Sequence, residues 1–71
     1  MTIKELGLYI KSLREKKKLL QSDLAKLTET KQPAIARLET GKLNICFKTL
    51  SAIADALGYD LIIKFVKKKV K

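Results

Sequence analysis

The chain has 71 residues, 46% of them hydrophobic, and 16 Lys or Arg against seven Asp or Glu give it a formal net charge of +9. This apolar content suffices for one small core and excludes wholesale disorder. There is no secretory signal pattern and no run near the ~20 apolar residues of a membrane span, so we expect a cytoplasmic protein.

The positive charge is unevenly distributed. Residues 1–60 carry a net charge of +4, whereas residues 61–71 contain five lysines and no acid. An excess of basic residues indicates a polyanionic binding partner. We expect nucleic acid as the first candidate and an anionic membrane surface as the second. The basic tail, residues 67–71, is either a solvated terminus that protects a strand edge from aggregation or a non-specific membrane or nucleic-acid contact.

Residue types used in catalysis are scarce. The chain has no His, which removes His-based metal sites and the usual general base near neutral pH, and its carboxylates are not clustered. We therefore expect no catalytic residue, no metal, no cofactor and no enzymatic activity. The single cysteine, Cys46, cannot form an internal disulfide and is predicted to be a small, partly buried residue.

The first two helices follow from capping and periodicity. Thr2 and Glu5 form a capping-box pattern, which predicts a helix over about 3–17. Gly7 inside that helix suggests close packing. A second helix is expected over about 21–28. The predicted inward side chains of these two helices are Ile3, Leu6, Ile10 and Leu13, then Leu24, Ala25 and Leu27.

A third helix is predicted over about 32–40. Pro33 is tolerated in its first turn, and Gly41 is suited to ending it. Ile35 and Leu38 share one face and are assigned to the core. The polar side of so short a helix is left free for another purpose.

A fourth helix is predicted over about 47–57, with Gly58 ending it. Its apolar stripe comprises Phe47, Leu50, Ile53, Ala54 and Leu57. The segment 60–66 is β-branched and aromatic and predicts a strand, whose simplest partner is the same strand of a second copy. The expected dimer interface comprises Leu61, Ile62, Ile63, Phe65 and Val66. With no linker or repeat, residues 1–71 read as one domain.

Several segments together resemble the Cro/C1-type (Xre family) helix-turn-helix domain. They are Leu19-Leu20-Gln21-Ser22-Asp23-Leu24-Ala25, Gln32-Pro33-Ala34-Ile35-Ala36-Arg37-Leu38-Glu39-Thr40-Gly41-Lys42, Thr49-Leu50 and Ile53-Ala54-Asp55-Ala56-Leu57-Gly58. The resemblance runs ungapped over residues 6–58. It implies an all-α, compact four-helix, lambda-repressor-like fold. The strand after Gly58 resembles the C-terminal strand that HipB-like antitoxins pair across a dimer.

The chain departs from the family pattern at four positions. Leu20 stands where Ser or Thr usually caps the second helix, a loss worth ~1 kcal/mol. Lys18 and Glu29 stand where the family often has Gly, which puts the turn geometry there in question. Ile45 replaces a common loop proline.

The resemblance also implies roles for individual residues. Gln32, Pro33 and Arg37 match positions that face base edges in the major groove, where Gln can pair with adenine and Arg with guanine. The plainer reading is an exposed helix face with a helix-starting proline. Arg14 and Glu39 match an internal salt bridge. The expected phosphate contacts are Gln21, Lys31, Thr40, Lys42, Asn44 and Lys48.

The implied function is regulation of transcription. A homodimer would bind double-stranded DNA at a palindromic operator and repress it. Within that reading, two alternatives stay open. One is an antitoxin and autorepressor with a cognate toxin partner; the other is a stand-alone phage-like or chromosomal regulator with none.

Overall fold

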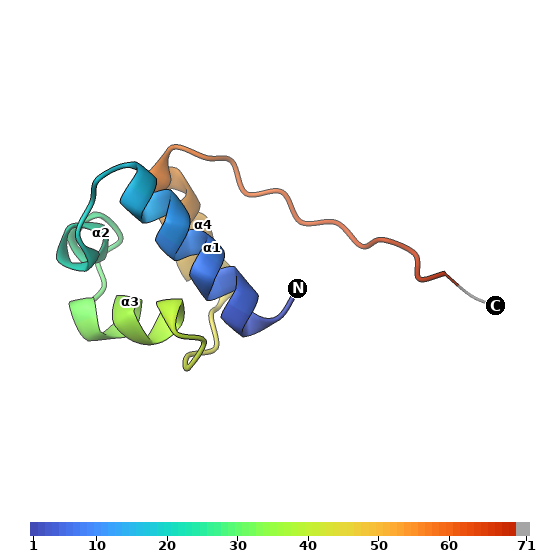
Figure 1. Cartoon of the computed structure of the whole chain (residues 1–71). Coiled ribbons are helices and arrows are strands. Elements are labelled where there is room, and N and C mark those ends of the chain that lie inside the picture. The colour runs from blue at the N-terminus through green and yellow to red at the C-terminus, as the bar shows by residue number, and fades with distance from the viewer. Residues whose placement is uncertain (70–71) are drawn as a thin grey trace.

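The computed structural model describes residues 1–69 and contains four helices joined by short turns. They are α1 (Ile3–Lys16), α2 (Gln21–Leu27), α3 (Gln32–Glu39) and α4 (Phe47–Leu57). α3 packs on both α1 and α2, and α2 also contacts α4. Figure 1 shows the helices gathered into one body, from which the chain after Gly58 extends away on the side opposite α2. The predicted all-α, four-helix fold is confirmed.

The core draws apolar side chains from every helix. Its buried members are Ile10, Leu24, Ala25, Ile35, Leu38, Ile53 and Leu57. Gly7 lies where α1 crosses the end of α3, and a Cβ there would stand 3.0 Å from the carbonyl carbon of Glu39. This confirms the close packing expected at Gly7, because any side chain would push the two helices apart.

Three of the side chains expected inside lie on the surface. Leu27 is 58% exposed, since the buried side of α2 is centred between Leu24 and Ala25, and Leu27 lies about 110° round the helix from that centre. Phe47 is 65% exposed because it is the first residue of α4, about 120° round from Ile53. Cys46 is also exposed, because it precedes α4 as the N-cap residue rather than lying within the helix.

The helix starts use side-chain caps where the sequence supplies them. At α1, Glu5 N–H donates to Thr2 Oγ1 (3.0 Å) and Thr2 N–H donates to Glu5 Oε1 (2.7 Å), which completes the predicted capping box and lowers the pKa of Glu5. At α2, Leu20 provides no side-chain cap, as expected. One half of the box survives, because Leu20 N–H donates to Asp23 Oδ2 at 2.8 Å.

Every helix ends in the same hydrogen-bonded turn, with a left-handed residue after its last turn. Gly41 and Gly58 adopt positive φ without cost, but Lys18 (φ 59°) and Glu29 (φ 56°) take the same conformation. At Lys18 the turn is closed by a bond from Leu19 N–H to the Arg14 carbonyl at 3.1 Å. The turn geometry questioned at these two positions is therefore kept, at the expense of backbone strain.

Residues 59–69, the arm, have no regular secondary structure. The strand predicted over 60–66 is thus absent from the single chain, because no other extended segment among residues 1–69 lies beside it to complete its hydrogen bonds. Its pairing with a second copy stays a prediction. Of the predicted basic tail, residues 70 and 71 lie outside the described residues. No helix in the described part of the chain is long and apolar enough to cross a membrane.

We expect Lys18→Gly to raise the free energy of unfolding by about 0.5 kcal/mol. A non-glycine residue in this conformation costs ~1 kcal/mol, and the larger backbone entropy that glycine loses on folding offsets part of the gain. Lys16→Gly removes the same charge from within α1 and should lower stability by up to about 1 kcal/mol. Urea denaturation followed by circular dichroism compares the two; equal effects would contradict the strain at Lys18.

Candidate nucleic-acid interface

The exposed side of α3 is polar, whereas the opposite side is part of the core. Ile35, Leu38 and Glu39 are buried. The side chains of Gln32, Pro33 and Arg37 are exposed, as base contact would require. Pro33 lies in the first turn, where its missing N–H leaves no helix hydrogen bond unmade.

A buried ion pair holds α3 against α1. Arg14 is 7% and Glu39 2% exposed. The guanidinium donates from Nε to Glu39 Oε2 at 2.6 Å and from Nη2 to Oε1 at 3.0 Å, which confirms the predicted pair. The third donor, Nη1, binds the Leu19 carbonyl at 2.7 Å, in the turn before α2. Hydrogen bonding to Glu39 raises the pKa of Arg14, so the guanidinium stays charged inside the domain.

Hydrogen bonds connect this pair to the start of α3. Gln21 Nε2 donates to Glu39 Oε1 at 3.0 Å, and Gln32 Nε2 donates to Gln21 Oε1 at 2.7 Å. A carboxylate only accepts hydrogen bonds, so the Gln21 amide must turn its NH₂ towards Glu39 and its oxygen towards Gln32. The Gln32 amide is oriented in turn, with its oxygen and one N–H left over.

The oriented Gln32 amide has the groups that adenine recognition needs. An adenine edge in the major groove offers one acceptor and one donor, and a glutamine meets both with one N–H and its oxygen. The sequence placed Gln21 among phosphate contacts and did not suggest its bonds to Gln32 and Glu39. One feature of the sequence could have indicated the bond between Gln21 and Gln32: the two glutamines are 11 residues apart, and each is the first residue of a helix.

From Lys31 to Lys48, the exposed charges are all positive. Residues 31–48 contain four cationic side chains, all exposed, and one carboxylate. That carboxylate is Glu39, which is buried and neutralised by Arg14. The cations are Lys31, Arg37, Lys42 and Lys48. No acidic side chain on this stretch therefore opposes the approach of a phosphate backbone.

The other expected phosphate contacts differ in how many of their polar groups are already hydrogen-bonded within the protein. Asn44 is exposed in the loop after α3. The hydroxyl of Thr40 is already bonded to the carbonyls of Ala36 and Arg37, both at 3.1 Å. A phosphate contact by Thr40 would require that hydroxyl to leave its internal acceptors. Gln21 is half-buried and shares its amide with Glu39 and Gln32, so its N–H groups are partly used.

The family follows from the match to a sequence model together with this geometry. The helix-turn-helix family model matches residues 10–63, which span α2, α3 and α4 and most of α1. The chain belongs to the helix-turn-helix family. Its helices share the arrangement of an Xre-type helix-turn-helix DNA-binding domain. A search of curated protein sequences gives no significant match.

Solved structures share the fold. Two structures of the clp gene regulator ClgR from Corynebacterium glutamicum, both 23% identical to this chain, superpose with TM-scores of 0.81 and 0.82. They match 84% and 86% of this chain, and the chain spans 64% and 78% of theirs. HipB in the HipA–HipB–O2–O3 complex is 25% identical, with a TM-score of 0.78 and 94% coverage of both chains.

The described residues hold no group of three or more carboxylate or cysteine side chains placed to bind a metal ion. The thiol of Cys46 lies 3.2 Å from Thr49 Oγ1, and this bond, with the backbone N–H groups at the start of α4, lowers its pKa. Cys46 occupies the N-cap position of α4 but makes no side-chain capping hydrogen bond.

Proposed function

We propose that this protein is a sequence-specific repressor of transcription that binds a palindromic operator as a homodimer. The observation that carries the proposal is the exposed polar face of α3, with the Gln32 amide already oriented and only cations among the exposed charges of residues 31–48. An operator bound in this way is closed to polymerase, which makes repression the natural outcome.

In this proposal Gln32 and Arg37 read base edges. Gln32 pairs with adenine through the two groups that Gln21 leaves free, and Arg37 pairs with guanine O6 and N7. Pro33 contacts a thymine methyl group. Phosphates are bound by exposed groups around α3, which fix the register of the helix without reading sequence. These are Gln21, Lys31, Thr40, Lys42, Asn44 and Lys48.

A second copy is needed because one eight-residue helix reads only a few base pairs. We assign dimerisation to the arm, whose apolar side chains are largely exposed in the single chain: Leu61, Ile62, Ile63, Phe65 and Val66. Two-fold symmetry then presents two α3 helices to half-sites about one DNA turn, ~10 bp, apart.

We further propose that the protein is the antitoxin and autorepressor of a toxin–antitoxin operon, with a cognate toxin as its partner. Supporting this is the likeness to HipB over 94% of both chains, which includes most of the arm. The second candidate is a stand-alone regulator, favoured by the likeness of the helical body to the gene regulator ClgR. The presence or absence of a neighbouring toxin gene separates the two.

Selection of binding sites from random DNA tests the function as a whole. We expect a palindrome whose half-sites are about 10 bp apart. Recovered sites without symmetry would contradict the dimer, and no enrichment of any sequence would contradict specific DNA binding.

Arg37→Ala should weaken binding to the selected operator by about 1–3 kcal/mol and relax one base position in each half-site. Lys42→Ala should weaken binding to operator and scrambled DNA alike and lower the salt slope by about 1. Titrations of both variants at several salt concentrations distinguish the roles. An equal loss on both DNAs for Arg37→Ala would exclude base reading.

Gln21→Ala should reduce discrimination at the adenine read by Gln32, because the Gln32 amide loses the acceptor that orients it. We expect the preference for adenine over the other bases to fall by about tenfold, within the 1–3 kcal/mol of a good bidentate contact. Lys42→Ala leaves the bond between Gln21 and Gln32 in place and is the control, for which the preference for adenine should not change. If Gln21→Ala weakened all sequences equally, Gln21 would act on phosphate alone.

A further inference from the structure

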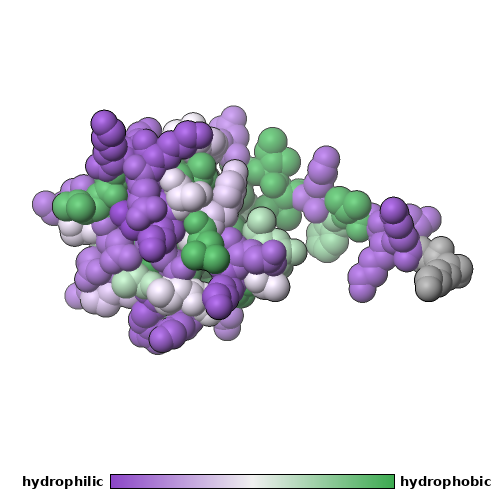
Figure 2. All heavy atoms as spheres, in the orientation of Figure 1, coloured by the Kyte–Doolittle hydropathy of each residue, from purple (hydrophilic) through white to green (hydrophobic). Residues whose placement is uncertain are grey.

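The arm carries more exposed apolar surface than any other part of the described chain. Phe65 is fully exposed, and Ile62 and Val66 are 81% and 80% exposed. Within residues 59–69, only Leu61 is partly buried. Figure 2 shows these apolar groups standing out from the body, interleaved with hydrophilic ones.

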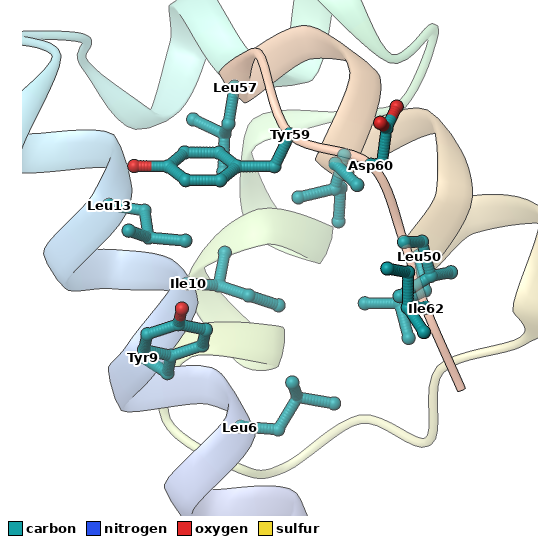
Figure 3. A pocket seen from close by; sticks show the side chains of 12 residues that line it. Leu6, Tyr9, Ile10, Leu13, Leu50, Leu57, Tyr59, Asp60 and Ile62 are labelled. Carbon is teal, nitrogen blue, oxygen red and sulfur yellow. The ribbon is translucent and has the colours of Figure 1, made fainter. Parts of the chain in front are cut away.

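The base of the arm closes one side of an apolar groove between α1 and α4. The groove has a volume of about 280 Å³. In Figure 3, Tyr59 points across it towards Leu13 of α1, whereas Asp60 points away. Leu61 is half-buried, whereas Ile62 also lines the groove but is 81% exposed. We therefore place Tyr59 and Leu61 on the side of the arm that faces the body, and Asp60 and Ile62 on the other, as alternation along an extended chain requires.

Symmetry restricts how two arms can pair. In an antiparallel pair, directly opposed residues alternate between hydrogen-bonded and non-hydrogen-bonded sites. A two-fold axis exchanges the two members of each opposed pair, and both copies of that pair must occupy the same kind of site. Because the two kinds of site alternate along each strand, two residues at the same kind of site differ in number by an even amount. The residue midway between them therefore lies opposite its own copy in the partner.

We propose that the central residue is Ile62, so that two arms pair in a single register about it. This rests on the dimer proposed above and specifies how it forms. Asp60 then lies opposite the partner's Lys64, twice by symmetry, which joins the one acid of the arm to a lysine. Tyr59 lies opposite the partner's Phe65, and Leu61 lies opposite the partner's Ile63.

The neighbouring registers match less well. A centre at Ile63 places Lys64 opposite the partner's Ile62 and leaves Asp60 opposite an apolar residue. A centre at Lys64 opposes two like charges and brings Lys67 opposite the partner's Leu61, on the apolar side. A centre at Leu61 places Asp60 opposite the partner's Ile62 and Lys64 opposite the partner's Gly58. Neighbouring centres differ by two residues in pairing, so each side chain keeps its face and the match of Asp60 with Lys64 distinguishes the registers.

The register also accounts for the groove and for the lysines beyond the arm's apolar part. The partner's Phe65, opposed to Tyr59, covers the open side of the groove. Pairing ends at Gly58, so Lys67 falls level with the partner's Leu57, at the C-terminal end of α4. Lys17 Nζ already donates to the Leu57 carbonyl at 3.5 Å, and the partner's Lys67 would add a second cation at this negative end of the helix dipole.

Cysteine cross-linking tests the register, with Cys46→Ser in every variant because the native thiol is free and exposed. In the proposed register, the cysteine of Ile62→Cys lies opposite the same cysteine of the partner. This variant should form a disulfide-linked dimer about tenfold faster than Leu61→Cys or Ile63→Cys under the same mild oxidation. Leu61→Cys mixed with Ile63→Cys should cross-link as a heterodimer. Faster linkage of either variant alone than of Ile62→Cys would overturn the register.

Charge exchange is the independent measurement. Asp60→Lys and Lys64→Asp should each raise the dimer Kd about tenfold, and the double variant should return to within about threefold of the unsubstituted protein. Failure of the double variant to recover would overturn the proposal. So would an unsubstituted protein that sediments as a monomer, whereas operator binding by that same protein reports separately on the proposed DNA-binding function.

Discussion

The ion pair between Arg14 and Glu39 is the constraint on which the rest of the domain depends. Two charges inside a 71-residue domain are tolerated only if both are paired and hydrogen-bonded, and the bidentate contact fixes α1 against α3 in distance and direction. Gly7 permits that approach, because the two helices meet at its backbone. The third donor of Arg14 ties down the turn before α2 through the Leu19 carbonyl. The position of α3 is thus set from the interior.

The same pair determines the chemistry of the surface. One oxygen of Glu39 accepts a bond from Gln21, which orients Gln21 and, through it, Gln32. The rigid core thus holds the Gln32 side chain, which we propose reads a base. Gln32 therefore loses less conformational entropy when the protein binds DNA. Burial of Glu39 also removes the one negative charge among residues 31–48, and the exposed stretch becomes wholly cationic. The proposed affinity for phosphate and the proposed base reading therefore share one structural cause.

The arm differs from the body in having no partner within the chain. Its backbone groups and apolar side chains face solvent, and its charges are one acid near Gly58 and lysines further out. In Figure 1 it leaves the body on the side away from α2, so pairing through it would leave the N-terminal ends of α2 and α3 uncovered. Specificity in the proposed function needs both parts, since the helix reads a half-site and the arm sets the distance between two of them.

Local patterns in the sequence determined the four helices, their caps and most of the core, because periodicity and capping act within a few residues. The position of Pro33, the box at Thr2 and Glu5, and the left-handed turns at Gly41 and Gly58 are all local. Resemblance to the family added the Arg14–Glu39 pair, which lies 25 residues apart in the chain. Only the tertiary structure decided which apolar residues stay outside, as at Leu27 and Phe47, because the packing of the helices determines which side of α2 and of α4 faces the core. It alone revealed the bonds of Gln21, since they form where three helices meet, and no pattern along one helix encodes that meeting.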